Sequence, residues 1–211
     1  MQIAVVLYDR FTALDAVGPY EVLSRAPGAE TVFVAERPGP VRTDTGALAL
    51  VADRSLGEVR APDVVVVPGG PGQSALMEHG PLLDWLRAAD ATSTWTTSVC
   101  TGSLLLAAAG LLDGRRATSH WLALDQLKRH GAAPAEERVV FDGKYVTAAG
   151  VSAGIDMGLT LLGRIAGDEH AQAVQLATEY DPRPPYDAGS PHKAPARVVE
   201  RLRAGSRFIL R

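Results

Sequence analysis

The fold of this chain is decided by one stretch, Thr94-Trp95-Thr96-Thr97-Ser98-Val99-Cys100-Thr101-Gly102-Ser103-Leu104-Leu105-Leu106-Ala107-Ala108-Ala109-Gly110. Its first part is rich in β-branched residues, which favour a strand, and its second part is rich in Leu and Ala, which favour a helix. The only cysteine of the chain, Cys100, stands at the corner between them. Ser98 and Gly102 leave the room that a sharp turn needs. The pattern predicts a nucleophile elbow with Cys in place of Ser.

Cys100 has two interpretations. An elbow strains the backbone of its corner residue, and the following helix points N–H groups and a positive dipole end at the side chain. Both features favour a thiolate, so we expect a reactive nucleophile that is exposed above the sheet. The alternative is a small buried hydrophobic residue, which is the usual role of a free cysteine. The elbow context favours the nucleophile.

Composition limits the class of protein. With 211 residues, of which 46% are hydrophobic, the chain is expected to form a single α/β domain over residues 1–211. A net charge of −3 with scattered Lys and Arg argues against nucleic acid as a partner. No apolar run approaches the ~20 residues that span a bilayer, so no membrane partner is expected. The single cysteine and the lack of a secretory signal favour the reducing cytoplasm.

Apolar runs that predict buried strands alternate with segments that predict helices. This order is typical of a three-layer α/β sandwich, with a mostly parallel sheet between helices on both faces. Strands are expected at 2–7, 31–35, 63–67, 94–99 and 116–118, and helices at 15–23, 53–59, 74–89, 120–129, 155–179 and 196–204. The helix 74–89 could be kinked at Gly80-Pro81. A small hairpin or a side excursion is expected at 41–52, and a hairpin at 139–147 with a type I′ turn at Asp142-Gly143. The proline-rich segment 180–191 is expected to be irregular.

Three loops of the predicted sheet carry groups suited to chemistry. They hold Asp15, Gly69-Gly70 and Cys100, and all three follow strands. In an open parallel sheet, ligands bind outside the carboxyl ends of the strands. A thiol needs a partner that handles its proton, and Asp15 is the natural candidate. Asp15 could equally be the N-cap of a helix, and spacing alone leaves both interpretations open.

Donors for a developing negative charge are also predicted. The backbone N–H groups of Gly70 and Thr101 are candidates, and the Thr101 hydroxyl is a further one. The alternatives are an ordinary loop for Gly69-Gly70 and a plain helix N-cap for Thr101.

Among the histidines, only His120, which precedes Trp121, falls near the predicted active face, and it could equally be packed at the start of a helix. No spacing of His, Cys, Asp and Glu resembles a metal site, and no glycine-rich nucleotide loop is present, so neither a metal nor a cofactor is expected. His120, Trp121, Val151 and Tyr186 are the expected lining of a substrate pocket, from their loop positions and character.

Four stretches, 14–23, 67–72, 98–103 and 150–156, resemble the ThiJ/PfpI superfamily. This resemblance implies a flavodoxin-like α/β sandwich with a cysteine elbow, related to the class I glutamine amidotransferases. The stretch 117–121 is also shared with the sensor domains of AraC-type regulators, although no helix-turn-helix domain follows here. The late blocks 180–182 and 185–191 are similar to members that hydrate isonitriles (isocyanides).

The resemblance implies roles for individual residues. Cys100 would be the nucleophile, Asp15 the general acid and base, and Thr101 a neighbour that supplies a hydrogen bond, with Gly70 completing the donors. Water would be added to an isonitrile to give an N-substituted formamide through a covalent cysteine thioimidate, without a cofactor. Thr101 stands where peptidase-like relatives carry a histidine, and the late His-x-Glu pair of glutaminases is missing. Family members are commonly homodimers, so a homodimer is expected.

Two other functions use the same residues. A cysteine with a carboxylate partner also suits glyoxalase or deglycase chemistry on α-oxoaldehydes. An exposed thiol of low pKa could instead serve as a non-enzymatic oxidation sensor.

Overall fold

A seven-stranded sheet runs through the centre of the computed structural model, which describes residues 1–206. Residues 207–211 of the predicted domain lie outside this range. The strand order is β10-β11-β7-β6-β1-β2-β5, and every neighbouring pair is parallel except β10 and β11. The strands are β1 Gln2–Val6, β2 Glu30–Ala35, β5 Arg54–Ser55, β6 Val64–Val67, β7 Trp95–Val99, β10 Val139–Asp142 and β11 Tyr145–Ala148. The mostly parallel sheet predicted from the sequence is confirmed.

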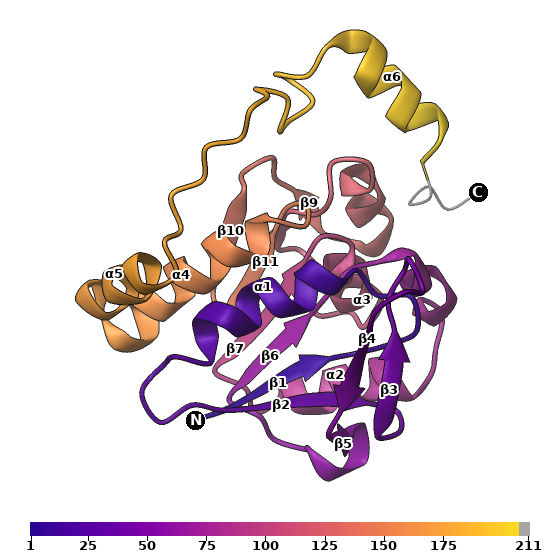
Figure 1. Ribbon diagram of the computed structural model, residues 1–211. Coiled ribbons are helices and arrows are strands. Elements are labelled where there is room, and N and C mark those ends of the chain that lie inside the picture. The colour runs from indigo at the N-terminus through magenta and orange to yellow at the C-terminus, as the bar shows by residue number, and fades with distance from the viewer. Residues whose placement is uncertain (207–211) are drawn as a thin grey trace.

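Helices cover both faces of this sheet (Figure 1). On one face, α1 (Ala13–Leu23) packs along α4 (Ala153–Ala166), and α5 (Asp168–Ala177) packs on α4. The other face carries α2 (Pro81–Asp90) and α3 (Gly102–Ala108). The side chains of β6 are fully buried, because both faces of that strand are covered. The three-layer, flavodoxin-like sandwich is therefore confirmed.

Several predicted helices are shorter than expected. The predicted helix 74–89 consists of a 3₁₀ helix, η2 (Pro71–Leu76), and α2, with a break before Pro81. The predicted helix 155–179 is divided into α4 and α5 at Gly167, which has a φ of 89° that a helix cannot continue through. The first break falls at Gly80-Pro81, where the sequence allowed for a kink. Hydrophobic periodicity continued across Gly167, which is why the sequence pattern did not reveal the second break.

Other segments differ in type. The predicted helix 120–129 is a 3₁₀ helix, η3 (Leu124–His130), and the predicted helix 53–59 is β5 followed by the 3₁₀ helix η1 (Leu56–Glu58). The predicted strand 116–118 is β8 (Arg116–Ala117), which pairs with β9 (Ala133–Pro134) outside the main sheet.

The two predicted hairpins are present. One is formed by β3 (Gly39–Arg42) and β4 (Ala49–Ala52), and the other by β10 and β11. In the second hairpin Asp142 pairs with Tyr145, and only Gly143 in the loop has a positive φ, of 61°. This is the pattern of a type II′ turn, so the predicted type I′ turn is wrong.

The C-terminal part agrees with the prediction. Residues 180–191 contain no helix or strand, and α6 (Ala196–Ala204) follows at the predicted bounds. This irregular segment passes along one side of the molecule before α6 begins (Figure 1). No helix within residues 1–206 has the length and apolar character needed to cross a bilayer.

The elbow helix α3 begins directly against the end of β6. A Cβ atom on Gly102 would lie 2.1 Å from the carbonyl oxygen of Val67 and 2.8 Å from that of Pro68. Only glycine allows this approach, because both neighbours are backbone atoms that cannot rotate away. The contact brings the loop after β6 beside the elbow at the carboxyl edge of the sheet.

Candidate functional site

The backbone at Cys100 is strained, as the elbow predicts. Its φ is 58°, a left-handed conformation that costs a non-glycine residue on the order of 1 kcal/mol or more. The N–H group of Cys100 donates to the carbonyl oxygens of Ala148 (3.0 Å) and Ala149 (2.8 Å) at the end of β11. Its own carbonyl accepts the hydroxyls of Ser103 (3.1 Å) and Ser119 (3.0 Å). These four hydrogen bonds hold the strained corner in place.

The side chain of Cys100 is buried, with 0% of the residue exposed. The expectation of a side chain exposed above the sheet is therefore wrong, because the loops after β1, β6 and β11 close over the corner. Burial raises the pKa of the Cys100 thiol well above its usual value, and the negative charge of Asp15 raises the pKa further. Backbone N–H groups of Thr101 and Val151 donate to the sulfur and oppose the rise. Burial and the charge of Asp15 therefore disfavour the thiolate that the elbow pattern led us to expect.

Asp15 lies beside this sulfur, and a side-chain hydrogen bond joins the two groups. The residue is fully buried in the first turn of α1. The N-cap of that helix is Thr12, so Asp15 is not the cap that the alternative interpretation proposed. Its Oδ2 atom accepts the backbone N–H of Gly69 at 2.9 Å. The carboxylate therefore has a fixed orientation toward the thiol.

The loop after β6 passes between Asp15 and Thr101. A Cβ atom on Gly69 would lie 2.5 Å from the nitrogen of Thr101 and 2.9 Å from Oδ2 of Asp15, so only glycine fits. The next N–H group, that of Gly70, donates to the hydroxyl of Thr101 at 3.0 Å. The predicted oxyanion donor Gly70 thus holds Thr101 in this structure. The N–H group that reaches the Asp15 carboxylate is that of Gly69.

Tyr8 supports this loop from the opposite side. Its hydroxyl donates to the carbonyl oxygen of Pro68 at 2.8 Å. The pKa of Tyr8 is raised well above its usual value, first by burial and then by the charges of Asp15 and Cys100, so the hydroxyl keeps its proton. The carbonyl of Pro68 and the N–H of Gly69 belong to one peptide group. Tyr8 and Asp15 therefore bind the two ends of the same peptide.

The expected pocket residues have different positions. The backbone N–H group of Val151 donates to the sulfur of Cys100. His120 lies against Gly150, since a Cβ atom there would be 3.0 Å from its ring, and its Nδ1 accepts the N–H of Leu122 at 3.3 Å. The ring centroids of Trp121 and His120 are 6.0 Å apart. The guanidinium carbon of Arg203, on α6, lies 5.8 Å from the centroid of the Trp121 ring.

Tyr186 is 80% exposed in the irregular segment before α6, so a single chain does not bring it to the site. Its apolar character suggested a pocket position, but nothing in the sequence fixed the path of that segment.

Sequence reasoning missed Tyr8 and Ser119 as parts of the site. It also missed the N–H group of Gly69 as a donor to Asp15 and that of Val151 as a donor to sulfur. Tyr8 follows β1, and Ser119 follows β8. Tyr8 could have been found, because it is a buried polar residue at the carboxyl end of a strand. Within residues 1–206 no three His, Cys, Asp or Glu side chains gather as a metal site would require.

A parallel α/β sandwich whose cysteine elbow faces a buried carboxylate defines a recognisable class of proteins. The model of the DJ-1/PfpI family matches residues 1–164 of this chain. The chain therefore belongs to the DJ-1/PfpI family.

Individual relatives extend this result. An isonitrile hydratase of Pseudomonas putida is 45% identical over 203 residues, which cover 96% of this chain and 89% of the relative. A crystal structure of a ThiJ/PfpI family protein from Pseudomonas syringae has a TM-score of 0.93 at 41% identity, covering 96% of this chain and 84% of that one. The transcriptional regulator CdhR of Pseudomonas aeruginosa is 33% identical over 144 residues, which cover 67% of this chain and 42% of the regulator.

Replacing Tyr8 by Phe is expected to lower the free energy of unfolding by about 1–3 kcal/mol, because the buried carbonyl of Pro68 loses a donor. Tyr20→Phe is the matched control, since Tyr20 packs on Phe33 and its hydroxyl makes no hydrogen bond within residues 1–206. Urea unfolding of both variants measures the difference. Equal stability of the two variants would show that the Tyr8 hydroxyl does not support the loop.

Proposed function

We propose that this protein is an isonitrile hydratase, a lyase that adds water to an isonitrile to give an N-substituted formamide. The observation that supports this most directly is the buried pair of Cys100 and Asp15, joined by a hydrogen bond. The 45% identity to the hydratase of Pseudomonas putida over 96% of this chain gives separate support.

The chemistry of an isonitrile suits this pair. The terminal carbon of R–N≡C gains both a proton and a nucleophile, so the first step is a net addition of S–H to one carbon. Because the pKa of the Cys100 thiol is raised, the proton that the carbon needs stays between Cys100 and Asp15 at neutral pH. Asp15 passes the proton to the carbon, and the sulfur left behind attacks the same carbon. The product is a thioimidate, R–N=CH–S–Cys100, with Asp15 ionised.

Hydrolysis then needs a general base and a leaving group. Asp15 takes a proton from water, the resulting hydroxide adds to the thioimidate carbon, and Asp15 passes the proton to the nitrogen. Collapse of the tetrahedral intermediate breaks the C–S bond and releases R–NH–CHO. The departing sulfur takes back a proton, which restores the initial pair. One water molecule is consumed, and Cys100, Asp15 and water supply every group that reacts.

The neighbouring groups act on the sulfur and on Thr101. The N–H groups of Thr101 and Val151 stabilise negative charge on the sulfur whenever it carries one. The Thr101 hydroxyl, held by the N–H of Gly70, is the predicted donor toward the bound substrate. His120, Trp121 and Val151 remain the proposed lining for the N-substituent.

The direct test follows formamide formation from cyclohexyl isocyanide with purified protein. Cys100→Ala is expected to abolish turnover, and Asp15→Asn to reduce it by about 100-fold or more, the scale of a lost general acid and base. Asp84→Asn is the matched control, because Asp84 is an exposed carboxylate that pairs with Arg87 on α2. It is expected to keep full activity.

Three results would contradict the proposal. The first is no formamide from the parent protein, and the second is equal rates in Cys100→Ala. Turnover of methylglyoxal without turnover of isonitrile would favour the α-oxoaldehyde reaction instead.

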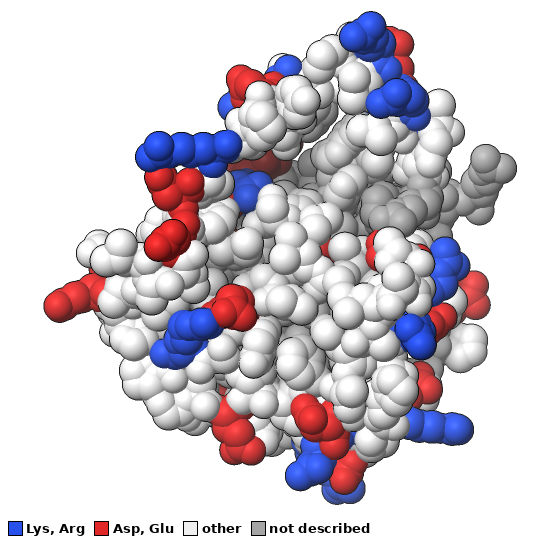
Figure 2. Space-filling view, viewed as in Figure 1, with Lys and Arg blue, Asp and Glu red and all other residues white. Residues whose placement is uncertain are grey.

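We also propose that the chain forms a homodimer and works in the reducing cytoplasm. Acidic and basic side chains on the face in Figure 2 are mixed, and a broad uncharged area lies among them. Leu14, next to Asp15 on α1, and Tyr186 are exposed apolar side chains of the kind that an interface covers. Sedimentation velocity is expected to give twice the mass of the chain, and a single-chain mass would contradict the dimer.

A further inference from the structure

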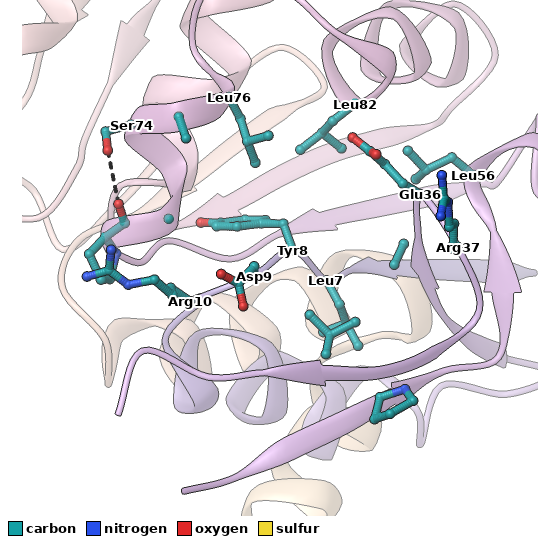
Figure 3. Close-up of a pocket in the computed structure, with 16 residues that line it drawn as sticks. Leu7, Tyr8, Asp9, Arg10, Glu36, Arg37, Leu56, Ser74, Leu76 and Leu82 are labelled. Atoms are coloured by element: carbon teal, nitrogen blue, oxygen red, sulfur yellow. Dashed lines mark hydrogen bonds between the residues drawn. The ribbon is translucent and has the colours of Figure 1, made fainter. Parts of the chain in front are cut away.

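A cavity of about 530 Å³ opens at the carboxyl edge of the sheet, on the other side of the loops that hold the Cys100–Asp15 pair. Its walls come from the segments that follow β1, β2 and β6 (Figure 3). Neither Cys100 nor Asp15 lines it. Parallel α/β sheets bind ligands at this edge, and small-molecule pockets have volumes of roughly 300–1,000 Å³.

The floor of the cavity is apolar. Leu7, Leu56 and Leu82 line it and are almost completely buried. The ring of Tyr8 lies between Leu7 on one side and Leu76 and Leu82 on the other (Figure 3). A flat aromatic ring among leucines offers a surface for an apolar group of similar size.

The rim is charged, and its charges are balanced. Asp9 and Arg10 follow β1, while Glu36 and Arg37 follow β2, so each segment supplies one acid and one base. Figure 3 shows Arg10 at one end of the cavity and Glu36 and Arg37 at the other. Within residues 1–206, none of these four side chains forms an ion pair. Charges of both signs are therefore available to a ligand.

Arg10 is held in a strained backbone conformation. Its φ is 62°, its N–H donates to the carbonyl of Arg42 at 2.9 Å, and its carbonyl accepts the N–H of Gly72 at 3.3 Å. Strain of this kind persists only where the surroundings impose it, and it is common at residues that clamp ligands. Here the strained backbone places the Arg10 side chain at one end of the apolar cavity, while the Asp9 carboxylate lies closer to the Tyr8 ring (Figure 3).

We propose that this cavity binds an α-amino acid with a large apolar side chain. The ligand carboxylate lies on Arg10, its ammonium group on Asp9, and its side chain over Tyr8 and the leucines. A simple carboxylic acid would leave Asp9 without an ion-pair partner, and a simple amine would leave Arg10 without one. Only a zwitterion satisfies both neighbours at once. The proposal stands independently of the isonitrile reaction.

Isothermal titration of the full chain with L-phenylalanine tests this site. We expect saturable binding, and at least about 10-fold weaker binding of 3-phenylpropanoate, which lacks the ammonium group, and of 2-phenylethylamine, which lacks the carboxylate. Asp9→Asn and Arg10→Asn are each expected to weaken L-phenylalanine binding by about 10-fold or more. Asparagine tolerates a positive φ, so the second variant removes the guanidinium without adding strain. Arg201→Gln, on the exposed face of α6, is the matched control and is expected to bind as the parent does.

The proposal is overturned if L-phenylalanine gives no saturation up to roughly 10 mM. It is also overturned if either analogue binds as tightly as the amino acid. Unchanged affinity in both Asp9→Asn and Arg10→Asn would contradict the placement of the ligand. Circular dichroism of each variant confirms that the fold is intact before affinities are compared.

Discussion

At the centre of the molecule, a side-chain hydrogen bond joins the Cys100 thiol to the Asp15 carboxylate, with both side chains fully buried. Burial makes a second negative charge at this point costly, so the pair retains one proton between two acidic groups. The proposed reaction uses that proton, because the isonitrile carbon must receive one as the sulfur attacks. A thiol whose pKa is raised, which would be a disadvantage in a simple nucleophile, is suited to a reaction in which S–H adds as a unit.

Much of the surrounding architecture keeps this pair in position. Cys100 lies at the end of β7 and Asp15 in the first turn of α1, and the loop after β6 is inserted between α1 and the elbow. Successive N–H groups of that loop, from Gly69 and Gly70, hold Asp15 and Thr101. Tyr8 fixes the same loop through the carbonyl of Pro68, and its ring forms part of the second cavity. One loop therefore separates two sites that share a wall.

The order of strands and helices was predictable because buried parallel strands and the elbow have strong local patterns. The bounds of β1, β2, β6 and β7 lie within one residue of those predicted from apolar runs, and α6 has the predicted bounds. β5 was missed, because its two residues fall in a stretch predicted as a helix. The break at Gly80 was predictable as a kink, because a Gly-Pro pair interrupts a helix, but the break at Gly167 was not, since the periodicity continues across it. For the site, the convergence of Asp15, Gly69-Gly70 and Cys100 was predictable from their place after neighbouring strands. The burial of Cys100 was not, because it depends on how three loops pack over the corner. The position of Tyr186 was not predictable either, because a proline-rich segment has no pattern that fixes its path.

The shared proton is tested most directly by titrating the thiolate of Cys100 through its ultraviolet absorbance. Cys100 is the only cysteine of the chain, so Cys100→Ala supplies the blank for tyrosine ionisation. The parent protein is expected to show a thiol pKa above the ordinary value, because burial and the charge of Asp15 both disfavour the thiolate. Asp15→Asn removes that charge and is expected to lower the thiol pKa relative to the parent. A parent thiolate that is already formed at neutral pH, or an unchanged pKa in Asp15→Asn, would contradict the account.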